Sequence, residues 1–304
     1  RQYCGNTWVW DGATWSTVQA YDDGARPDDR RGHVMAYDPI LDKTILFGGH
    51  GAEVCDEDAG SELCSDTWQW TGTQWQEVGM GVSDPQPSGR EDASLVYCPK
   101  EQRLMLFGGD AGEGNSCDGG DRYCDTLWSW EGTRWEKRAL DSQSAELPAP
   151  VGRTAATLSV DQFGHLLLMG GRRTTNDEAG DCTAGDTALC TGMWWFQDTW
   201  VDLAQSQSTA RPAARYDHVM AALPGQGTTV LFGGIDESQQ GCGAGASYYC
   251  DDTWVWNGSG WQERVVDTKP GVREGARMHY DSVTEEAVMT GGKGKGGQCD
   301  GRAG

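Results

Sequence analysis

A Gly-Gly pair that closes a short apolar run occurs five times along the chain, and this repeat constrains the fold more than any other feature. The first glycines of the pairs stand at positions 48, 108, 170, 233 and 291, so the intervals are 60, 62, 63 and 58 residues. A period of this kind indicates that each unit is one supersecondary structure and that neighbouring units bury a common core. We therefore expect one fold of five units.

Each unit also shares residues on both sides of its Gly-Gly pair. A [DN]-T-(L)-W step follows the pair, and in four units a Gly turn and another Trp come next. The tryptophans alternate with period two, as in Trp68 and Trp70, which predicts strands, and the Gly turns predict tight hairpins. An arginine precedes the apolar run in every unit: Arg30, Arg90, Arg153, Arg215 and Arg273.

The composition agrees with an all-β fold. The 304 residues include 44 Gly and 15 Trp, and only 37% are hydrophobic, so the core must rest on aromatic side chains between many turns. The sequence predicts four short antiparallel strands in each unit.

The order of Arg, apolar strand, Gly-Gly, D-T-W and G-x-x-W resembles the Kelch repeat over essentially the whole chain. The resemblance implies a five-bladed Kelch-like β-propeller with four-stranded antiparallel blades, forming a single domain over 1–304. The units are longer than the about 50 residues of a Kelch repeat, and five blades are fewer than most Kelch propellers have. The expected blades are 30–80, 90–140, 153–205, 215–266, and 273–304 together with 1–20.

The two ends of the chain are predicted to share the last blade. Residues 6–18 supply only a third and a fourth strand, and residues 276–292 supply only a first and a second. From the first Gly of a pair to the Thr of the next D-T-W step there are 19, 18, 29 and 20 residues, and 20 when the count runs across the chain ends. The ring is therefore expected to close by N-terminal strands that complete the last blade.

The third unit departs from the pattern. Its connection is lengthened by TGMWWFQ at 191–197, and VDLAQSQST at 201–209 lacks the G-x-x-W strand. We interpret 191–197 as an insertion whose adjacent Trp194 and Trp195 either cover a weak blade or bind a partner.

The eleven cysteines indicate disulfides, because they lie in polar Gly/Asp-rich segments without the short CxxC pairs of zinc sites. Cys98 remains as an unpaired thiol at a turn. Disulfides imply an oxidising compartment, so we expect a secreted, extracellular or cell-surface protein, and the lack of a leader before Arg1 suggests a mature or excised form. The expected pairs are Cys55–Cys64, Cys117–Cys124, Cys182–Cys190, Cys242–Cys250 and, across the chain ends, Cys4–Cys299.

Charge and hydropathy exclude some partners. With 24 Lys+Arg against 46 Asp+Glu the net charge is −22, which disfavours nucleic acid. No stretch approaches the roughly 20 apolar residues of a membrane span. The acidic loops offer oxygen ligands for Ca²⁺ at Asp56, Asp58, Asp118 and Asp121, although the spacing matches no EF-hand. No other cofactor or metal spacing is found, and no catalytic grouping can be assigned.

We therefore expect a binding or assembly module rather than an enzyme. In a Kelch blade the loop between strands two and three and the loop into strand one lie on the same face, so we expect the disulfide-closed loops to surround the arginines. In some Kelch receptor domains arginines at this motif position bind acidic peptides. The simpler interpretation is that each Arg pairs with an acidic residue of its own or the next blade. The partner would be a protein or further copies of the chain. The alternative is an extracellular carbohydrate-binding or carbohydrate-active enzyme, whose many Trp would stack on sugars; burial of the W-x-W tryptophans would remove its main support.

Overall fold

The fold is built almost entirely of antiparallel strands. The computed structural model describes residues 5–18, 26–52, 55, 62–81, 84–118, 120–138, 148–175, 180–182, 185–203, 210–238, 242 and 248–294. In these residues the only helical element is a 3-10 turn at Pro224–Gln226. No helix in this part of the chain has the length and apolar character to cross a membrane.

The chain divides into two compact units. The first comprises residues 1–97 and 102–138, and the second comprises residues 98–101 and 139–304.

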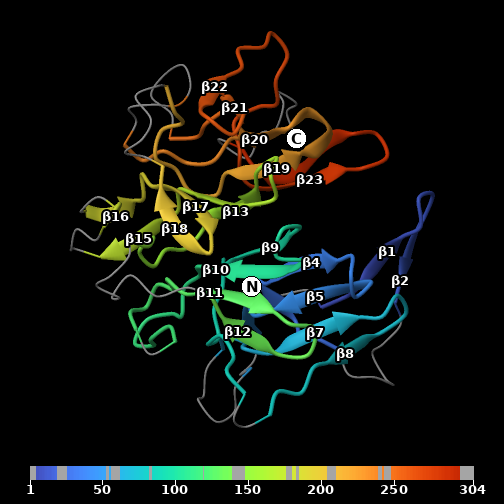
Figure 1. The fold of residues 1–304 in the computed structure, drawn as a ribbon. Helices are drawn as coiled ribbons and strands as arrows, with labels where there is room; N and C mark the ends of the chain where they lie inside the picture. Colours follow the sequence, from blue (N-terminus) through green and yellow to red (C-terminus); the bar gives the residue numbers. More distant parts are fainter. Residues whose placement is uncertain are drawn as a thin grey trace. The chain divides into compact units, whose positions relative to one another are not determined.

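The first unit contains two four-stranded sheets with the same topology (Figure 1). In each sheet the strands follow one another in chain order. The antiparallel pairs include β4–β5, β5–β7, β7–β8, β10–β11 and β11–β12. A two-stranded sheet of β1 (Trp8–Trp10) and β2 (Trp15–Thr17) precedes them, and β3 (Arg30–Arg31) pairs with β6 (His50–Gly51). One larger sheet comprises β4 (Val34–Asp38), β5 (Lys43–Phe47), β7 (Thr67–Trp70) and β8 (Trp75–Glu77). The other comprises β9 (Ser94–Cys98), β10 (Arg103–Phe107), β11 (Leu127–Trp130) and β12 (Trp135–Lys137).

The second unit has two further four-stranded sheets and ends in a hairpin. The hairpin consists of β23 (Glu274–Asp281) and β24 (Glu286–Lys293), and β15 (Arg172–Thr175) pairs with β16 (Gly185–Leu189). One four-stranded sheet comprises β13 (Thr157–Val160), β14 (Leu166–Met169), β17 (Met193–Gln197) and β18 (Thr199–Asp202). The other comprises β19 (Val219–Leu223), β20 (Thr228–Phe232), β21 (Thr253–Trp256) and β22 (Trp261–Glu263).

Aromatic and aliphatic side chains from adjacent sheets form the cores, as the composition predicted. In the first unit Ile45 and Phe47 pack with Leu106 and Trp135, and the rings of Phe47 and Trp135 meet edge to face at 5.3 Å. Such pairs add to the stabilisation by area burial. In the second unit the core between the two larger sheets includes Leu167, Met169, Met193, Leu231, Trp254, Trp256 and Trp261.

The third repeat is organised differently from the sequence interpretation. Residues 193–197 are not an insertion: they form β17, which pairs with β14 as the third strand, with Leu168 opposite Trp194. The D-T-W segment then becomes the fourth strand, β18, after a turn at Asp198, whose φ is 64°. The four-stranded sheet is complete, and the interpretation of 191–197 as an insertion is wrong.

The chain-end segments form two separate two-stranded sheets. The pair β1–β2 belongs to the first unit and β23–β24 to the second. The prediction that they share one blade is not confirmed by the strand pairing, and neither is the number of blades.

Candidate functional site

The five repeat arginines make the same backbone contacts, one in each repeat. Each Nε donates to the backbone carbonyl two residues earlier, as Arg215 does to Ala213 at 3.0 Å. Each Nη1 donates to the carbonyl of the first Gly of the pair that follows, at distances of 3.0–3.3 Å: Gly48, Gly108, Gly170, Gly233 and Gly291. All five arginines are buried, with no more than 8% of their surface exposed.

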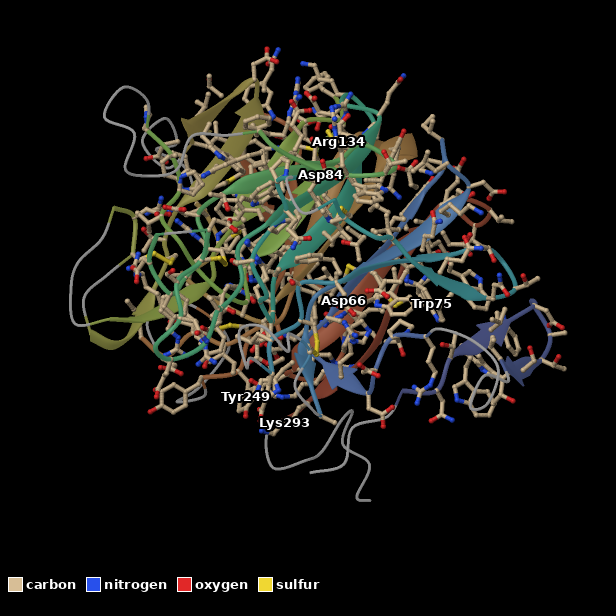
Figure 2. The ribbon with its side chains drawn as sticks, turned by 90° about the horizontal axis from the view of Figure 1, so that it is seen from below. Asp66, Trp75, Asp84, Arg134, Tyr249 and Lys293 are labelled. Carbon is tan, nitrogen blue, oxygen red and sulfur yellow. A yellow bond between two sulfur atoms is a disulfide. The ribbon has the colours of Figure 1, made fainter. Side chains whose placement is uncertain are left out.

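Among the described residues, Arg30, Arg90, Arg153 and Arg215 also form ion pairs with a carboxylate of their own repeat. Arg215 Nη1 and Nη2 donate to Asp252 Oδ1 and Oδ2 at 2.6 and 2.8 Å, and Arg30 binds Asp66, labelled in Figure 2, at 2.6 and 2.7 Å. The planar guanidinium matches a carboxylate in this two-point geometry. The geometry therefore agrees with the simpler interpretation, in which the arginines belong to the architecture of the repeat.

In the other two pairs the acid comes from a stapled loop. Arg90 donates to Asp118 at 2.8 and 2.9 Å, and Arg153 donates to Asp181. Asp118 follows Cys117 and Asp181 precedes Cys182, so these carboxylates tie the loops themselves to the sheet end. This role of the two loop carboxylates was not predicted from the sequence. The signal available was the position of an Asp directly beside a loop cysteine.

The same carboxylates accept an indole N–H from the third strand. Trp68 donates to Asp66 at 2.6 Å and Trp254 to Asp252 at 2.7 Å. In the third repeat Trp194 donates to Asp181 at 2.9 Å. Trp194 thus takes the place of the first Trp in the W-x-W segments, and it is 5% exposed. Trp195, which points to the other side of β17, is partly buried against His165.

Asp118 was also a weak calcium candidate, and its contacts favour the ion pair instead. Burial by itself raises the pKa of Asp118, but the charge of Arg90 and hydrogen bonds from Thr126, Ser88 and Trp128 lower it to about 2. Asp121 is exposed in the same loop, where its carboxylate accepts the backbone N–H of Arg122 at 2.7 Å. Asp56 and Asp58 lie outside the described residues. Within the described part of the chain no three His, Cys, Asp or Glu side chains form a group suited to a metal ion.

Disulfides close the loops at the end where the arginines lie. Four of the expected pairs are bonded: Cys55–Cys64, Cys117–Cys124, Cys182–Cys190 and Cys242–Cys250. In each loop the second cysteine donates its backbone N–H to the second Gly of the preceding pair, as Cys64 does to Gly49 at 2.8 Å. Cys98 is a free and buried thiol. Cys4 and Cys299 lie outside the described residues.

The Gly-Gly pair lets neighbouring repeats approach closely. Gly49 donates its N–H to the Arg90 carbonyl at 2.8 Å, and Gly234 donates to the Arg273 carbonyl at 2.9 Å. A Cβ on Gly48, whose φ is 67°, would lie 2.8 Å from the Arg90 carbonyl oxygen. Only glycine combines this backbone conformation with that contact. In the first, third and fourth repeats the loop is therefore anchored to its own repeat and to the next one.

The W-x-W tryptophans of the complete sheets are mostly buried, which weakens the carbohydrate alternative. Trp128, Trp130, Trp254 and Trp256 are at most 6% exposed. Sugar stacking requires an accessible ring face, and these rings have none to offer. The equivalent side chains of the β1–β2 sheet are different: Trp8, Trp10 and Trp15 are 55%, 49% and 63% exposed.

Comparisons with known proteins bear on the fold. No protein-family model matches the chain, and no curated protein matches it. Among solved structures the chain is similar to one titled "Structure of YjhT", which has a propeller-type fold, with a TM-score of 0.57 and 14% sequence identity over 98% of this chain and 93% of that chain. At this identity the likeness supports the fold alone. The chain is an all-β protein of propeller type with several four-stranded antiparallel sheets.

Proposed function

We propose that this chain is an extracellular, non-enzymatic binding module, a Kelch-like propeller that presents its disulfide-stapled loops to a protein partner. The observation that carries the proposal is the repeated anchor beneath these loops: a buried arginine, its carboxylate partner, the Gly-Gly pair and a disulfide. Binding sites are commonly carried on loops held by a rigid scaffold. The arginines support this surface from below and do not contact the partner.

The charge of the loops indicates the chemistry of the partner. The side chains of Glu62 and Glu113 are 60% and 92% exposed at the loop end, and the chain as a whole carries a net charge of −22. Opposite charges across an interface steer association and select partners. We therefore expect a basic protein surface to bind at the loops.

The test compares two variants of equal charge. E62Q/E113Q removes two acids at the loop end, and E77Q/E136Q removes two exposed acids from the fourth strands β8 and β12 of the same sheets. With a lysine-rich peptide as the probe, we expect E62Q/E113Q to weaken binding about fivefold while E77Q/E136Q retains nearly wild-type affinity. Equal losses in both variants would mean general charge attraction without a loop surface.

We extend the proposal to the fifth blade, which β23–β24 would begin and β1–β2 would complete. Each hairpin lies beside a complete sheet as a blade neighbour does. Trp75, labelled in Figure 2, donates its indole N–H to Thr7 at 2.8 Å, as Trp135 does to Thr67 at 2.9 Å. On the other side, Gly234 binds the Arg273 carbonyl as Gly49 binds that of Arg90.

The register of the complete four-stranded sheets predicts how β24 would pair with β1 in this blade. The residue four before the first Gly faces the second Trp of the W-x-W segment, as Thr44 faces Trp70 and Thr229 faces Trp256. By the same rule, Ala287 would lie opposite Trp10 and Met289 opposite Trp8 in the proposed blade. This pairing would cover tryptophans that the isolated β1–β2 sheet exposes, and apolar burial of that kind stabilises the sheet.

A carbohydrate-binding role remains the second candidate, because Trp8, Trp10 and Trp15 are exposed on one small sheet. The variant W15A separates the two. If these rings bind sugar, W15A retains stability and loses affinity for soluble oligosaccharides. If they complete a blade, W15A lowers the unfolding temperature and wild-type tryptophan fluorescence does not respond to oligosaccharides.

A further inference from the structure

A lysine, a histidine and an aspartate meet at two hairpin turns of the second unit, apart from the stapled loops. His165 Nδ1 lies 3.2 Å from Asp161 Oδ2, and His165 Nε2 lies 2.8 Å from Lys100 Nζ. Asp161 and His165 come from the turn between β13 and β14, and Lys100 comes from the turn after β9. The thiol of Cys98 donates to the Gly164 carbonyl at 3.1 Å and joins the two turns.

The imidazole of His165 is held in one orientation. Asp161 Oδ1 accepts the backbone N–H groups of Phe163 and His165 at 2.8 and 2.9 Å, which fixes the carboxylate. The His165 ring meets Trp195 edge to face at 4.5 Å, and His165 is 8% exposed. Lys100, in contrast, is exposed.

The donor and acceptor chemistry assigns the proton on the ring. A lysine ammonium has only donors, so His165 Nε2 must accept from Lys100 and the ring proton must lie on Nδ1, facing Asp161. An imidazole oriented by a carboxylate in this way is suited to take a proton from a nucleophile at its other nitrogen. Here that nucleophile is the amine of Lys100.

We propose that Lys100 is a covalent modification site for acyl donors that carry an apolar acyl group. Lys100 first loses one proton to water, and the lone pair of the neutral Nζ then attacks the acyl carbon. The C–N bond forms as the bond to the leaving group breaks, and the leaving group departs with that electron pair. The remaining excess proton on Nζ passes to His165 Nε2 and from there to the leaving group or to water, so the products are an amide and the leaving group, which is protonated in the first case and an anion in the second. Phe163, 64% exposed and with its ring 6.0 Å from that of His165, provides an apolar surface beside the amine.

The experiment measures acylation of individual lysines by peptide mapping. The folded protein is treated with limiting N-hydroxysuccinimide esters of acetate and benzoate, and Lys100 is compared with Lys293, an exposed lysine that lies 3.4 Å from Glu274 and is labelled in Figure 2. We expect Lys100 to react about tenfold faster than Lys293, with a larger excess for benzoate. In H165Q the faster acylation of Lys100 relative to Lys293 should disappear. In F163S only the preference of Lys100 for the benzoate ester should be lost.

If H165Q does not fold, the solvent isotope effect on acylation of the wild-type protein tests the role of His165 instead. Proton transfer to His165 in the rate-limiting step predicts that D₂O slows acylation of Lys100 more than that of Lys293. Equal rates at the two lysines with equal solvent isotope effects would overturn the proposal. A wild-type excess at Lys100 that persists in folded H165Q would overturn it as well.

Discussion

The indole N–H of Trp75 in β8 donates a hydrogen bond of 2.8 Å to the hydroxyl of Thr7, just before β1. The same contact joins Trp135 to Thr67, and in the second unit Trp261 donates to the sulfur of Met193 at 2.8 Å. In the last two cases a fourth-strand tryptophan reaches the first residue of the third strand in another sheet of the same unit. The contact of Trp75 with Thr7 is the one that the proposed fifth blade requires.

This hydrogen bond can be tested by removing the acceptor. T7V leaves the Trp75 N–H buried without its partner, and we expect a loss of about 1–2 kcal/mol in the free energy of unfolding. T17V changes an exposed threonine of the same hairpin and should have an effect within about 0.5 kcal/mol. Urea unfolding measures both, and equal effects would contradict a role for the contact.

The Arg215–Asp252 pair should be essential to the stability of its sheet. R215A leaves the Asp252 carboxylate buried and without the guanidinium, and removal of one partner of a buried pair costs about 3–5 kcal/mol. R211A, at an exposed position, serves as the control and should change the free energy of unfolding by less than about 0.5 kcal/mol. A similar stability of R215A and R211A would show that the pair does not anchor the loop end.

His218 should make the protein sensitive to mild acid. Burial, and then the charge of Arg215, lower the pKa of His218 from 6.5 to about 3, so the unfolded chain binds a proton in this range that the folded one does not. The stability that neutral His218 contributes to the free energy of unfolding is fully present above pH 6.5 and is lost as the pH falls towards 3. The loss is roughly 2 kcal/mol between pH 6.5 and 5.

The variant H218Q checks this assignment. Its free energy of unfolding should change less between pH 7 and pH 5 than that of the wild type, whereas H279Q, at an exposed histidine, should keep the wild-type pH dependence. If H218Q retains the full acid sensitivity, another group is responsible for it.

Cys98 should be unreactive in the folded protein. Burial raises the pKa of its thiol, and the thiolate is the reactive form. Treatment with iodoacetamide at neutral pH should leave Cys98 unmodified until denaturant is added, as followed by mass spectrometry. Rapid alkylation in the native state would show that the turn of residues 98–101 opens readily.

Much of the fold could be predicted because its signals are local and repeated. The period of the Gly-Gly pairs, the alternation of Trp68 and Trp70 and the cysteine spacings each depend on short-range geometry. The third repeat was misassigned because D-T-W marks the third strand elsewhere but the fourth strand here. Whether Trp194 or Trp200 occupies the third strand depends on pairing with β14, which local patterns do not encode.

The partners of the arginines were predictable only in part. Asp66 and Asp252 belong to the repeated D-T-W step, but Asp118 and Asp181 come from loops that differ in sequence between the repeats. Which carboxylate reaches a guanidinium depends on the path of the loop, and the disulfide sets that path. The meeting of Lys100 with His165 depends on packing between two turns 65 residues apart and had no sequence signal.

The most direct test of the account is the linkage of Cys4 and Cys299. Closure of the fifth blade within one chain predicts a monomer in non-reducing electrophoresis, and a proteolytic peptide in which Cys4 is bonded to Cys299 of the same molecule. A ladder that collapses on reduction would show instead that the end hairpins pair between copies. Free thiols at both positions, in a protein whose other disulfides are intact, would contradict the shared fifth blade.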